Sequence, residues 1–294
     1  SCGSPAAAVS DAIGSHPATT PDGGADAIEG EVVGIGAAPD SSSSTTAYTV
    51  TLSLTGERLF AGLPDGGNPF GTPPRDCIEP VLAADPDFPA AALADQLNAI
   101  RPNSALTVAA ELLEVAALAP LVAHVVEHFG RLDALVNNAS TYYATPIGDI
   151  AMQDWEALMG SNLRAPLFLA QAAAPHLKAS GGSIVNITDI HTERPMPDYV
   201  VYNVAKAGLR GLTHALARDL APAVRVNAVA PGPIAWPDDG QIASAERERI
   251  LAQVPLGREG GVGQIAEAVK YLICDAHFVT GHTINVDGGR SIAL

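Results

Sequence analysis

Lysine, cysteine and long apolar runs are scarce in this chain of 294 residues. The three cysteines, Cys2, Cys77 and Cys274, are too few and too scattered for a disulfide framework or a zinc site, so we expect a reducing compartment and no bound metal. Cys274 lies in an apolar segment and is expected to be a small buried residue.

No apolar run reaches the roughly 18 residues of a transmembrane helix. The N-terminus lacks a basic segment followed by an apolar one, so we expect no signal peptide and a cytoplasmic protein.

Basic residues are also few, because 16 Lys and Arg stand against 32 Asp and Glu and give a formal net charge of −16. This charge argues against nucleic acids and anionic membranes as partners, since both would be repelled. Aromatic residues make up only 5% of the chain, whereas alanine is abundant, as in proteins whose helices pack closely on a sheet. The length fits one large α/β domain, or one domain with a smaller appendage.

Residues 1–88 differ in composition from the rest of the chain. They are rich in proline, contain no lysine, and have only Arg58 and Arg75 as basic residues. Short strands are expected at 31–35 and 47–54. The residues between these strands are too rich in proline and serine for a crossover helix, so we expect a hairpin or disorder there.

Three glycines in this region, Gly30, Gly34 and Gly36, have the G-x-x-x-G-x-G spacing of a phosphate-binding turn. Such a turn works only between a strand and a helix whose amino end faces the phosphates. Here the preceding residues are turn-like, and the following ones include a proline and four serines. We therefore interpret these glycines as loop residues, which leaves the chain without a recognisable glycine-rich cofactor turn.

From about residue 89 onward, apolar patterning predicts helices that alternate with strands. Helices are expected at 90–101, 115–129, 155–177 and 262–274, together with one that holds Tyr202 and Lys206 and ends at Leu220; Gly130 stops the second helix. Strands are expected at 104–110, 132–137, 182–189, 224–229 and 281–286. We therefore expect two parts, an irregular or hairpin-containing segment at 1–88 and an α/β domain with a parallel sheet at 89–294.

The stretch 182–209 carries most of the chemistry. Its strand ends at Thr188 and Asp189, at the carboxyl edge where open α/β sheets bind ligands. Tyr202 and Lys206 are four residues apart and share one face of the next helix. A phenol beside an ammonium is a candidate proton donor, because the positive charge would lower the tyrosine pKa. The alternatives are an ordinary surface helix and an aspartate that caps backbone amides.

This strand, loop and Tyr-x-x-x-Lys helix resembles the short-chain dehydrogenase/reductase family, over about residues 90–294. The resemblance implies a Rossmann-like, doubly wound parallel sheet whose first strand-helix-strand unit is missing or replaced by residues 1–88. The family normally has a serine thirteen residues before the tyrosine, and Asp189 at that position resembles the pteridine reductases. An ionised carboxylate accepts hydrogen bonds and cannot donate them, so it suits a ring that offers N–H and amino groups.

Three further positions extend the resemblance. Residues 137–140 read Asn-Asn-Ala-Ser, and Tyr142 follows where pteridine reductases have an aromatic that stacks on the pterin; the alternative for Tyr142 is a loop packed by its own aromatics. Asn162 stands where the family bends a helix and holds a water of the proton relay, the alternative being an ordinary polar position. Trp236 lies in the family's substrate lid, or serves as a loop anchor.

The resemblance therefore implies a set of site residues. The catalytic residues are Asn162, Asp189, Tyr202 and Lys206; the cofactor contacts are Glu111, Leu112, Asn138, Ala139, Ser140, Tyr202, Lys206, Pro231 and Gly232; and the substrate contacts are Tyr142, Asp189 and Trp236.

The implied function is NADPH-dependent reduction of a C=N bond in a pterin or dihydrofolate-type small molecule, by a homo-oligomer. Tyr202 would donate the proton, while Lys206 lowers its pKa and holds the cofactor ribose. Two alternatives remain open: a short-chain reductase that acts on a carbonyl, and an inert family member that serves as a binding or subunit partner. The composition of residues 1–88 favours the inert alternative, unless that segment comes from a misread or fused gene.

Overall fold

The structure is a computed structural model that describes residues 50–51, 81–83, 94–95, 97–99, 102–234 and 244–293. Its strands are β1 (Val50–Thr51), β2 (Val81–Ala83), β3 (Leu106–Val108), β4 (Ala134–Asn137), β5 (Ser183–Ile187), β6 (Arg225–Pro231) and β7 (Thr283–Val286). Its helices are α3 (Val115–Phe129), α4 (Met152–Met159), α5 (Ala165–Ser180), α6 (Val200–Leu220), α7 (Ser244–Leu251), α8 (Val262–Cys274) and α9 (Arg290–Ala293). None of the helices in these ranges is long and apolar enough to cross a membrane.

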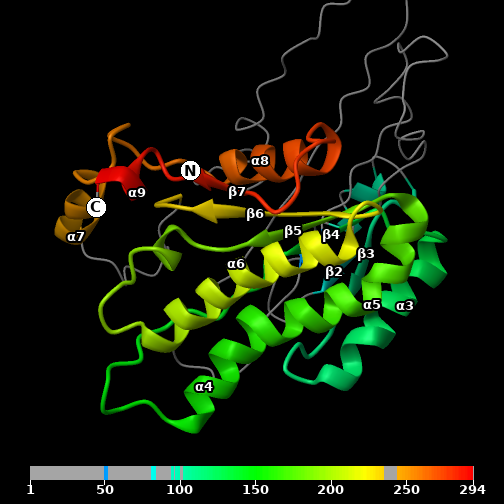
Figure 1. Cartoon of the computed structure of the whole chain (residues 1–294), viewed down its shortest axis with the longest axis horizontal. Coiled ribbons are helices and arrows are strands. Elements are labelled where there is room, and N and C mark those ends of the chain that lie inside the picture. Colours follow the sequence, from blue (N-terminus) through cyan, green and yellow to red (C-terminus); the bar gives the residue numbers. More distant parts are fainter. Residues whose placement is uncertain are drawn as a thin grey trace, which may run out of the picture.

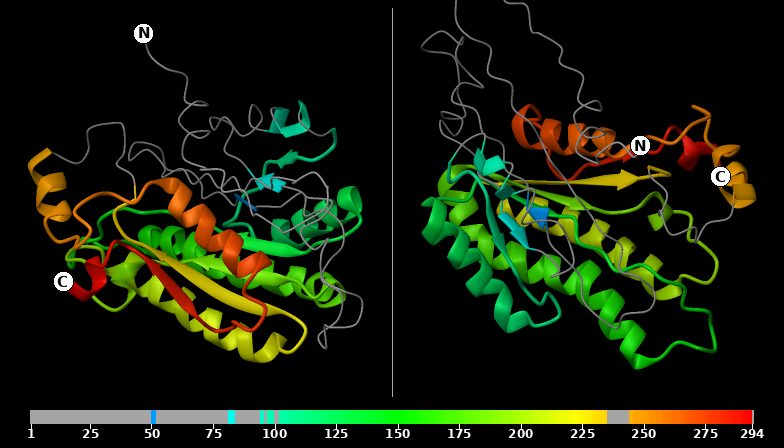
Figure 2. Two further views of the ribbon diagram at one scale, coloured as in Figure 1. Left: turned by 90° about the horizontal axis from the view of Figure 1, so that it is seen from above. Right: turned by 180° about the vertical axis from the view of Figure 1, so that it is seen from behind.

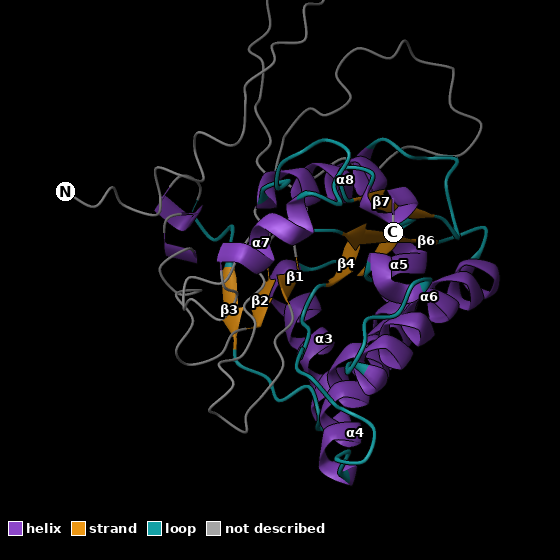
Figure 3. Ribbon diagram, turned by 90° about the vertical axis from the view of Figure 1, so that its left-hand side faces the viewer, coloured by secondary structure: helices purple, strands orange, loops and turns teal. Residues whose placement is uncertain are grey.

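The strands form a Rossmann-like sheet, as expected from the sequence. Strands β4, β5, β6 and β7 are neighbours in that order and all run parallel, while β1, β2 and β3 form a second group. Strand β1 contacts β4, so the two groups lie side by side in the order β3-β2-β1-β4-β5-β6-β7. Figure 3 shows β3, β2, β1 and β4 next to one another. Parallel strands bring their carboxyl ends to one edge, which places the ends of β4, β5 and β6 together.

The N-terminal part of the sheet departs from the sequence prediction. The neighbour of β3 is β2, which pairs with it in parallel, and β1, within the expected strand at 47–54, pairs antiparallel to β2. Strand β2 was not predicted, because it is only three residues long and follows directly after Pro80. This group therefore joins strands from both sides of residue 88. The strand expected at 31–35 lies outside the described residues.

Two layers of helices cover the sheet. Helices α3, α5 and α6 lie on one face and α8 lies on the other (Figures 1 and 2). Alternate residues of β5 face opposite sides, so Ile184 packs in the core with α3 and α5, whereas Val185 and Ile187 pack with α8. Cys274 is buried in the second core, as predicted.

Sequence patterning located the best-defined helices well. The bounds of α3 and α8 match the prediction, and Gly130 ends α3 in a left-handed conformation with φ 79°. The expected single helix at 155–177 is instead α4, a π-helical turn at Gly160–Arg164 and α5. The strands predicted at 104–110, 132–137, 182–189 and 281–286 are two to four residues longer than the observed ones, whereas β6 is one residue longer than predicted, because strand ends lack a capping signal in the sequence.

A buried chain of polar side chains fixes α6 against the sheet. Asn137 Nδ2 donates to Asn186 Oδ1 at 2.8 Å, and Asn186 Nδ2 donates to Thr213 Oγ1 at 2.9 Å. Thr213 in turn donates to the carbonyl of Leu209 at 2.9 Å. These bonds connect β4, β5 and α6 in a dry interior, where each hydrogen bond is strong and its loss is costly.

Arg225, at the start of β6, closes the carboxyl end of α8. Its guanidinium donates to the carbonyls of Leu272, Ile273 and Ala276 at 2.5, 2.7 and 3.0 Å. Carbonyls at the end of a helix receive no hydrogen bond from a following turn. The guanidinium supplies donors to these carbonyls, which would otherwise lack a partner in the helix.

We predict that Arg225→Met lowers the free energy of unfolding by about 2 kcal/mol, because it removes charge-assisted hydrogen bonds to a helix end. Urea denaturation measures the change. Arg218→Met, at an exposed position of α6, is the matched control and should change stability by less than about 0.5 kcal/mol. Equal effects of the two substitutions would contradict this role of Arg225.

Candidate active site

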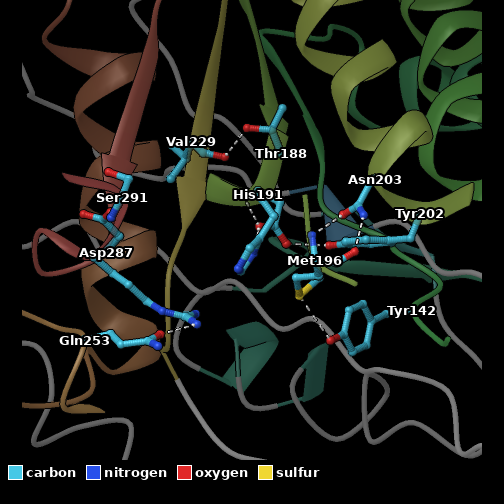
Figure 4. A network of polar contacts seen from close by, with 12 residues as sticks. Tyr142, Thr188, His191, Met196, Tyr202, Asn203, Val229, Gln253, Asp287 and Ser291 are labelled. Atoms are coloured by element: carbon cyan, nitrogen blue, oxygen red, sulfur yellow. Dashed lines mark hydrogen bonds and ion pairs between the residues drawn. The ribbon is translucent and has the colours of Figure 1, made fainter. Parts of the chain in front are cut away.

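The site lies where β5 and β6 end. After β5, Thr188 donates to the carbonyl of Val229 from both its N–H and its hydroxyl, at 2.8 and 3.1 Å (Figure 4). These bonds hold the end of β5 against β6. Asp189 follows and caps a short 3-10 helix at Ile190–Thr192, after which the chain returns through a loop to α6.

The carboxylate of Asp189 receives hydrogen bonds on both oxygens. Tyr202 Oη donates to Oδ2 at 2.7 Å, whereas the backbone N–H of His191 donates to Oδ1 at 2.7 Å and His191 Nδ1 lies 2.7 Å from the same oxygen. Burial alone would raise the pKa of Asp189, but the hydrogen bonds and charge of His191, together with the bond from Tyr202, bring it below its ordinary value. Asp189 is therefore an ionised acceptor.

The electrostatics of Tyr202 differ from the sequence expectation. Burial raises the pKa of Tyr202 well above its ordinary value, and the charge of Asp189 raises it further, while a hydrogen bond with Ser140 opposes them. The ammonium of Lys206 lies 5.8 Å from the centre of the tyrosine ring and donates to the carbonyl of Ile187 at 2.9 Å. The expectation that Lys206 acidifies Tyr202 is therefore wrong for this arrangement, because the nearest charge to the phenol is a carboxylate.

Lys206 is almost fully buried, with 2% of its surface exposed. Burial lowers the pKa of Lys206 to about 8, although the charge of Asp189 works in the opposite direction. An ammonium has three N–H donors, and the carbonyl of Ile187 is the acceptor found for Nζ within the described part of the chain. A buried cation with donors to spare is suited to hold hydroxyl groups of a ligand.

Asn162 lies in the π-helical turn that separates α4 from α5. Its amide Nδ2 donates to the carbonyls of Leu158 and Thr141, both at 2.9 Å, and its Oδ1 accepts from Ser140 Oγ at 2.7 Å. The interruption of the helix at Asn162, which the resemblance implied, is present. The side chain connects this turn to the loop after β4 and so positions Ser140 beside Tyr202.

Aromatic side chains form one wall of the site. Tyr142 stacks on Tyr199, with ring centres 4.7 Å apart and an interplanar angle of 17°, and meets Tyr202 edge-on at 4.9 Å. Its hydroxyl donates to Met196 Sδ at 3.8 Å. Burial raises the pKa of Tyr142, so this phenol stays neutral. One ring face is thus occupied by Tyr199, while 42% of the surface of Tyr142 remains exposed.

The remaining predicted contacts divide into two groups. Asn138, Ala139 and Ser140 directly follow β4, and Pro231 and Gly232 end and follow β6, so all five lie at the same sheet edge as Tyr202. A Cβ on Gly232 would come within 2.6 Å of Asp287 Cβ, so only glycine fits there.

Two further predicted contacts, Glu111 and Leu112, follow β3. Leu112 is 1% exposed and packs in the core, and Glu111 Oε1 accepts from the backbone N–H of Leu113 at 3.0 Å. Trp236 and the three N-terminal glycines, Gly30, Gly34 and Gly36, lie outside the described residues.

Sequence analysis missed four residues of the site: His191, Met196, Tyr199 and Asn203. Asn203 Nδ2 donates to the carbonyl of Met196 at 2.8 Å and so holds the loop before α6. The spacing of Asp189 and His191 is that of an aspartate turn and could have indicated their contact. The stacking of Tyr199 on Tyr142 had no local signal, since 57 positions separate them in the chain.

Comparisons with known proteins agree with this geometry. A protein-family model described as Enoyl-(Acyl carrier protein) reductase matches residues 81–291. Pteridine reductase 1 of Leishmania tarentolae is 36% identical over 244 residues, covering 69% of this chain and 84% of that protein. The 3-oxoacyl-(acyl-carrier-protein) reductase of Thermotoga maritima is 36% identical over 175 residues, covering 58% of this chain and 71% of its own length. Among solved structures, an apo SCOR enzyme from Clostridium thermocellum has a TM-score of 0.59 at 30% identity, covering 66% of this chain and 76% of that one.

The matched region includes the sheet from β2 to β7 and every residue that forms the site. Members of the matched group are oxidoreductases that bind a nicotinamide dinucleotide and act on small molecules. This chain belongs to the short-chain dehydrogenase/reductase family, in which it is pteridine reductase-like at moderate identity.

Proposed function

We propose that the protein is an NADPH-dependent reductase of a pterin or dihydrofolate-type substrate, and that it acts as a cytoplasmic homo-oligomer. The observation that carries this proposal is the ionised carboxylate of Asp189 at 2.7 Å from the Tyr202 hydroxyl. NADPH, rather than NADH, is proposed from the family likeness.

The carboxylate favours a nitrogen-containing ring over a bare carbonyl. A carboxylate oxygen accepts about two hydrogen bonds, and Oδ2 of Asp189 receives one, from Tyr202. It can therefore accept a second from a ring N–H or amino group. Tyr142 adds a partly exposed aromatic surface against which a flat ring can lie.

The residues at this edge also fit the nicotinamide end of a dinucleotide. Lys206 offers buried N–H donors for ribose hydroxyls, and Gly232 lets the chain pass closely beside Asp287. When bound, the reduced nicotinamide supplies the hydride. We propose that the segment 138–140, Pro231 and Gly232 line this end, that Glu111 and Leu112 line the adenine end, and that Trp236 covers the substrate.

In the proposed reaction, Tyr202 delivers the proton. Its hydroxyl hydrogen turns from Asp189 toward the substrate nitrogen, and the high pKa of the phenol means that the proton moves as negative charge develops on that nitrogen. Asn162 acts indirectly, because it holds Ser140 beside the tyrosine.

A carbonyl substrate is the second candidate, favoured by the similarity to a 3-oxoacyl-(acyl-carrier-protein) reductase. We predict that NADPH oxidation is faster with dihydrobiopterin or dihydrofolate than with simple ketones and 3-oxoacyl thioesters, which absorbance at the nicotinamide band measures. Turnover of only the carbonyl compounds would overturn the pterin assignment and leave the reductase assignment standing.

Tyr202→Phe should lower kcat at least about 100-fold, because it removes the proton donor and leaves the ring in place. Tyr271→Phe removes a hydroxyl from a tyrosine that is 46% exposed on α8 and should retain the wild-type kcat. Unchanged kcat in Tyr202→Phe would show that another group protonates the substrate.

Saturating NADPH should raise the melting temperature of the protein, since a ligand at about 100 times its Kd stabilises the folded state by about 2.7 kcal/mol. Differential scanning fluorimetry with NADPH, NADH and no cofactor measures this shift. Absence of a shift with either dinucleotide would instead support the inert alternative.

Lys206 should make stability depend on pH. The folded protein loses the lysine proton near pH 8, whereas the unfolded chain keeps it up to about the ordinary pKa of 10.5, so stability rises with pH in this window. The free energy of unfolding of the wild type should therefore rise by about 2 kcal/mol relative to Lys206→Met between pH 8 and 10, in urea titrations. The same comparison with Lys178→Met, at an exposed position of α5, should show no such rise.

A further inference from the structure

His191 lies in the site but has no role in the proposed reaction. Its side chain is 11% exposed, and two of its nitrogens lie 2.7 Å from a single oxygen, Oδ1 of Asp189. The backbone contact belongs to the aspartate cap of the 3-10 helix, so any residue at 191 could make it. The contact of Nδ1 is specific to histidine.

The two oxygens of Asp189 are thereby divided between two partners. Oδ1 accepts from His191, and Oδ2 accepts from Tyr202, so both oxygens help to fix the orientation of the carboxylate. Without the imidazole, Oδ1 keeps the backbone N–H of residue 191 and loses its side-chain partner. The carboxylate is then less firmly held about its Cβ–Cγ bond, and its charge is less stabilised.

We propose that His191 is a positioning residue of the reductase site, which holds Asp189 Oδ1 so that Oδ2 faces Tyr202 and the N–H of a bound ring. The inference rests on the proposed function, because it assigns to the carboxylate the recognition of such a ring. Within the described part of the chain, the imidazole of His191 contacts Asp189, so it acts through that carboxylate.

Electrostatics support the same role. Burial alone would raise the pKa of Asp189, and His191 is the largest of the influences that bring it down. The other groups that face this carboxylate are Tyr202 and Lys206 on α6, Tyr142 in the loop after β4, and Arg290 on α9. Both cations remain when His191 is replaced, so the change in the Asp189 pKa reports the loss of the imidazole itself.

The test compares His191→Leu, which removes the contact, with His191→Asn, whose side-chain amide keeps a neutral donor near the place of Nδ1. His191→Leu should move the acid limb of the pH profile of kcat/KM upward by about one pH unit or more, because a less stabilised carboxylate takes up its proton at higher pH. At pH values below the acid limbs of both proteins, kcat/KM of His191→Leu is then about ten-fold lower than that of the wild type. His191→Asn should recover part of this loss, and His214→Leu, at an exposed position of α6, should match the wild type.

A second measurement needs no turnover. The carboxyl carbon of Asp189, labelled with 13C and followed by NMR, should titrate at least about one pH unit higher in His191→Leu than in the wild type. Circular dichroism checks that each variant is folded. If His191→Leu does not fold, the comparison is made between the wild type and His191→Asn. An unchanged acid limb together with an unchanged carboxyl titration would overturn the proposal. A shifted titration in a protein that turns over no pterin or carbonyl substrate would support the role of His191 and overturn the proposed function instead.

Discussion

The hydrogen bond between Tyr202 and Asp189 is the interaction on which the site depends. Tyr202 is buried, the side chain of Asp189 is 17% exposed, and the bond of 2.7 Å joins a phenol to a carboxylate. In a medium of low polarity such a bond is strong, and either partner without the other would be left with an unsatisfied polar group. The bond keeps the tyrosine protonated and the aspartate ionised until a ligand arrives, so the site holds both a proton donor and an acceptor at neutral pH.

The fold explains why the two residues meet. Strand β5 is buried on both faces and ends at Ile187. The two hydrogen bonds from Thr188 to the carbonyl of Val229 fix the point where the chain leaves the sheet. The hydrogen bond from Asn186 to Thr213 holds helix α6 against β5, which fixes the position of Tyr202 relative to the end of the strand. The position of the phenol is therefore determined by the core of the protein. The loop between 190 and 199 connects the end of β5 to the start of α6.

Much of this arrangement could be predicted from the sequence, because it depends on local patterns. Short runs of apolar and β-branched residues located β4, β5 and β6, helical spacing placed Tyr202 and Lys206 on one face, and Gly130 marked the end of α3. The parts that could not be predicted depend on contacts between distant segments. Whether Lys206 acidifies the phenol is decided by the burial of Tyr202 and by the charge of Asp189, which raise the pKa of the phenol, and no spacing reveals their balance.

The same limit applies to Leu112 and β2. The side chain of Leu112 is buried in a core that it shares with residues of α3 and α5, and this burial depends on how distant segments pack. Strand β2 has three residues, too few to show a period, and it exists because β3 offers it an edge for pairing. Short elements and side-chain directions are set by tertiary context rather than by the local sequence.

The site also contains features that stability alone does not explain. Lys206 is an ammonium with 2% of its surface exposed, and the Oδ1 atom of Asn137 is buried with no hydrogen-bond partner within the described part of the chain. Each lowers the stability of the free protein, because buried polar groups need partners. Both lie beside the carboxyl edge at which Asp189 and Tyr202 meet, at the end of β4 and on the face of α6 that turns toward β5. A ligand at this edge could supply a contact to such a group, because a buried polar atom that the protein leaves open is free to accept or donate to it.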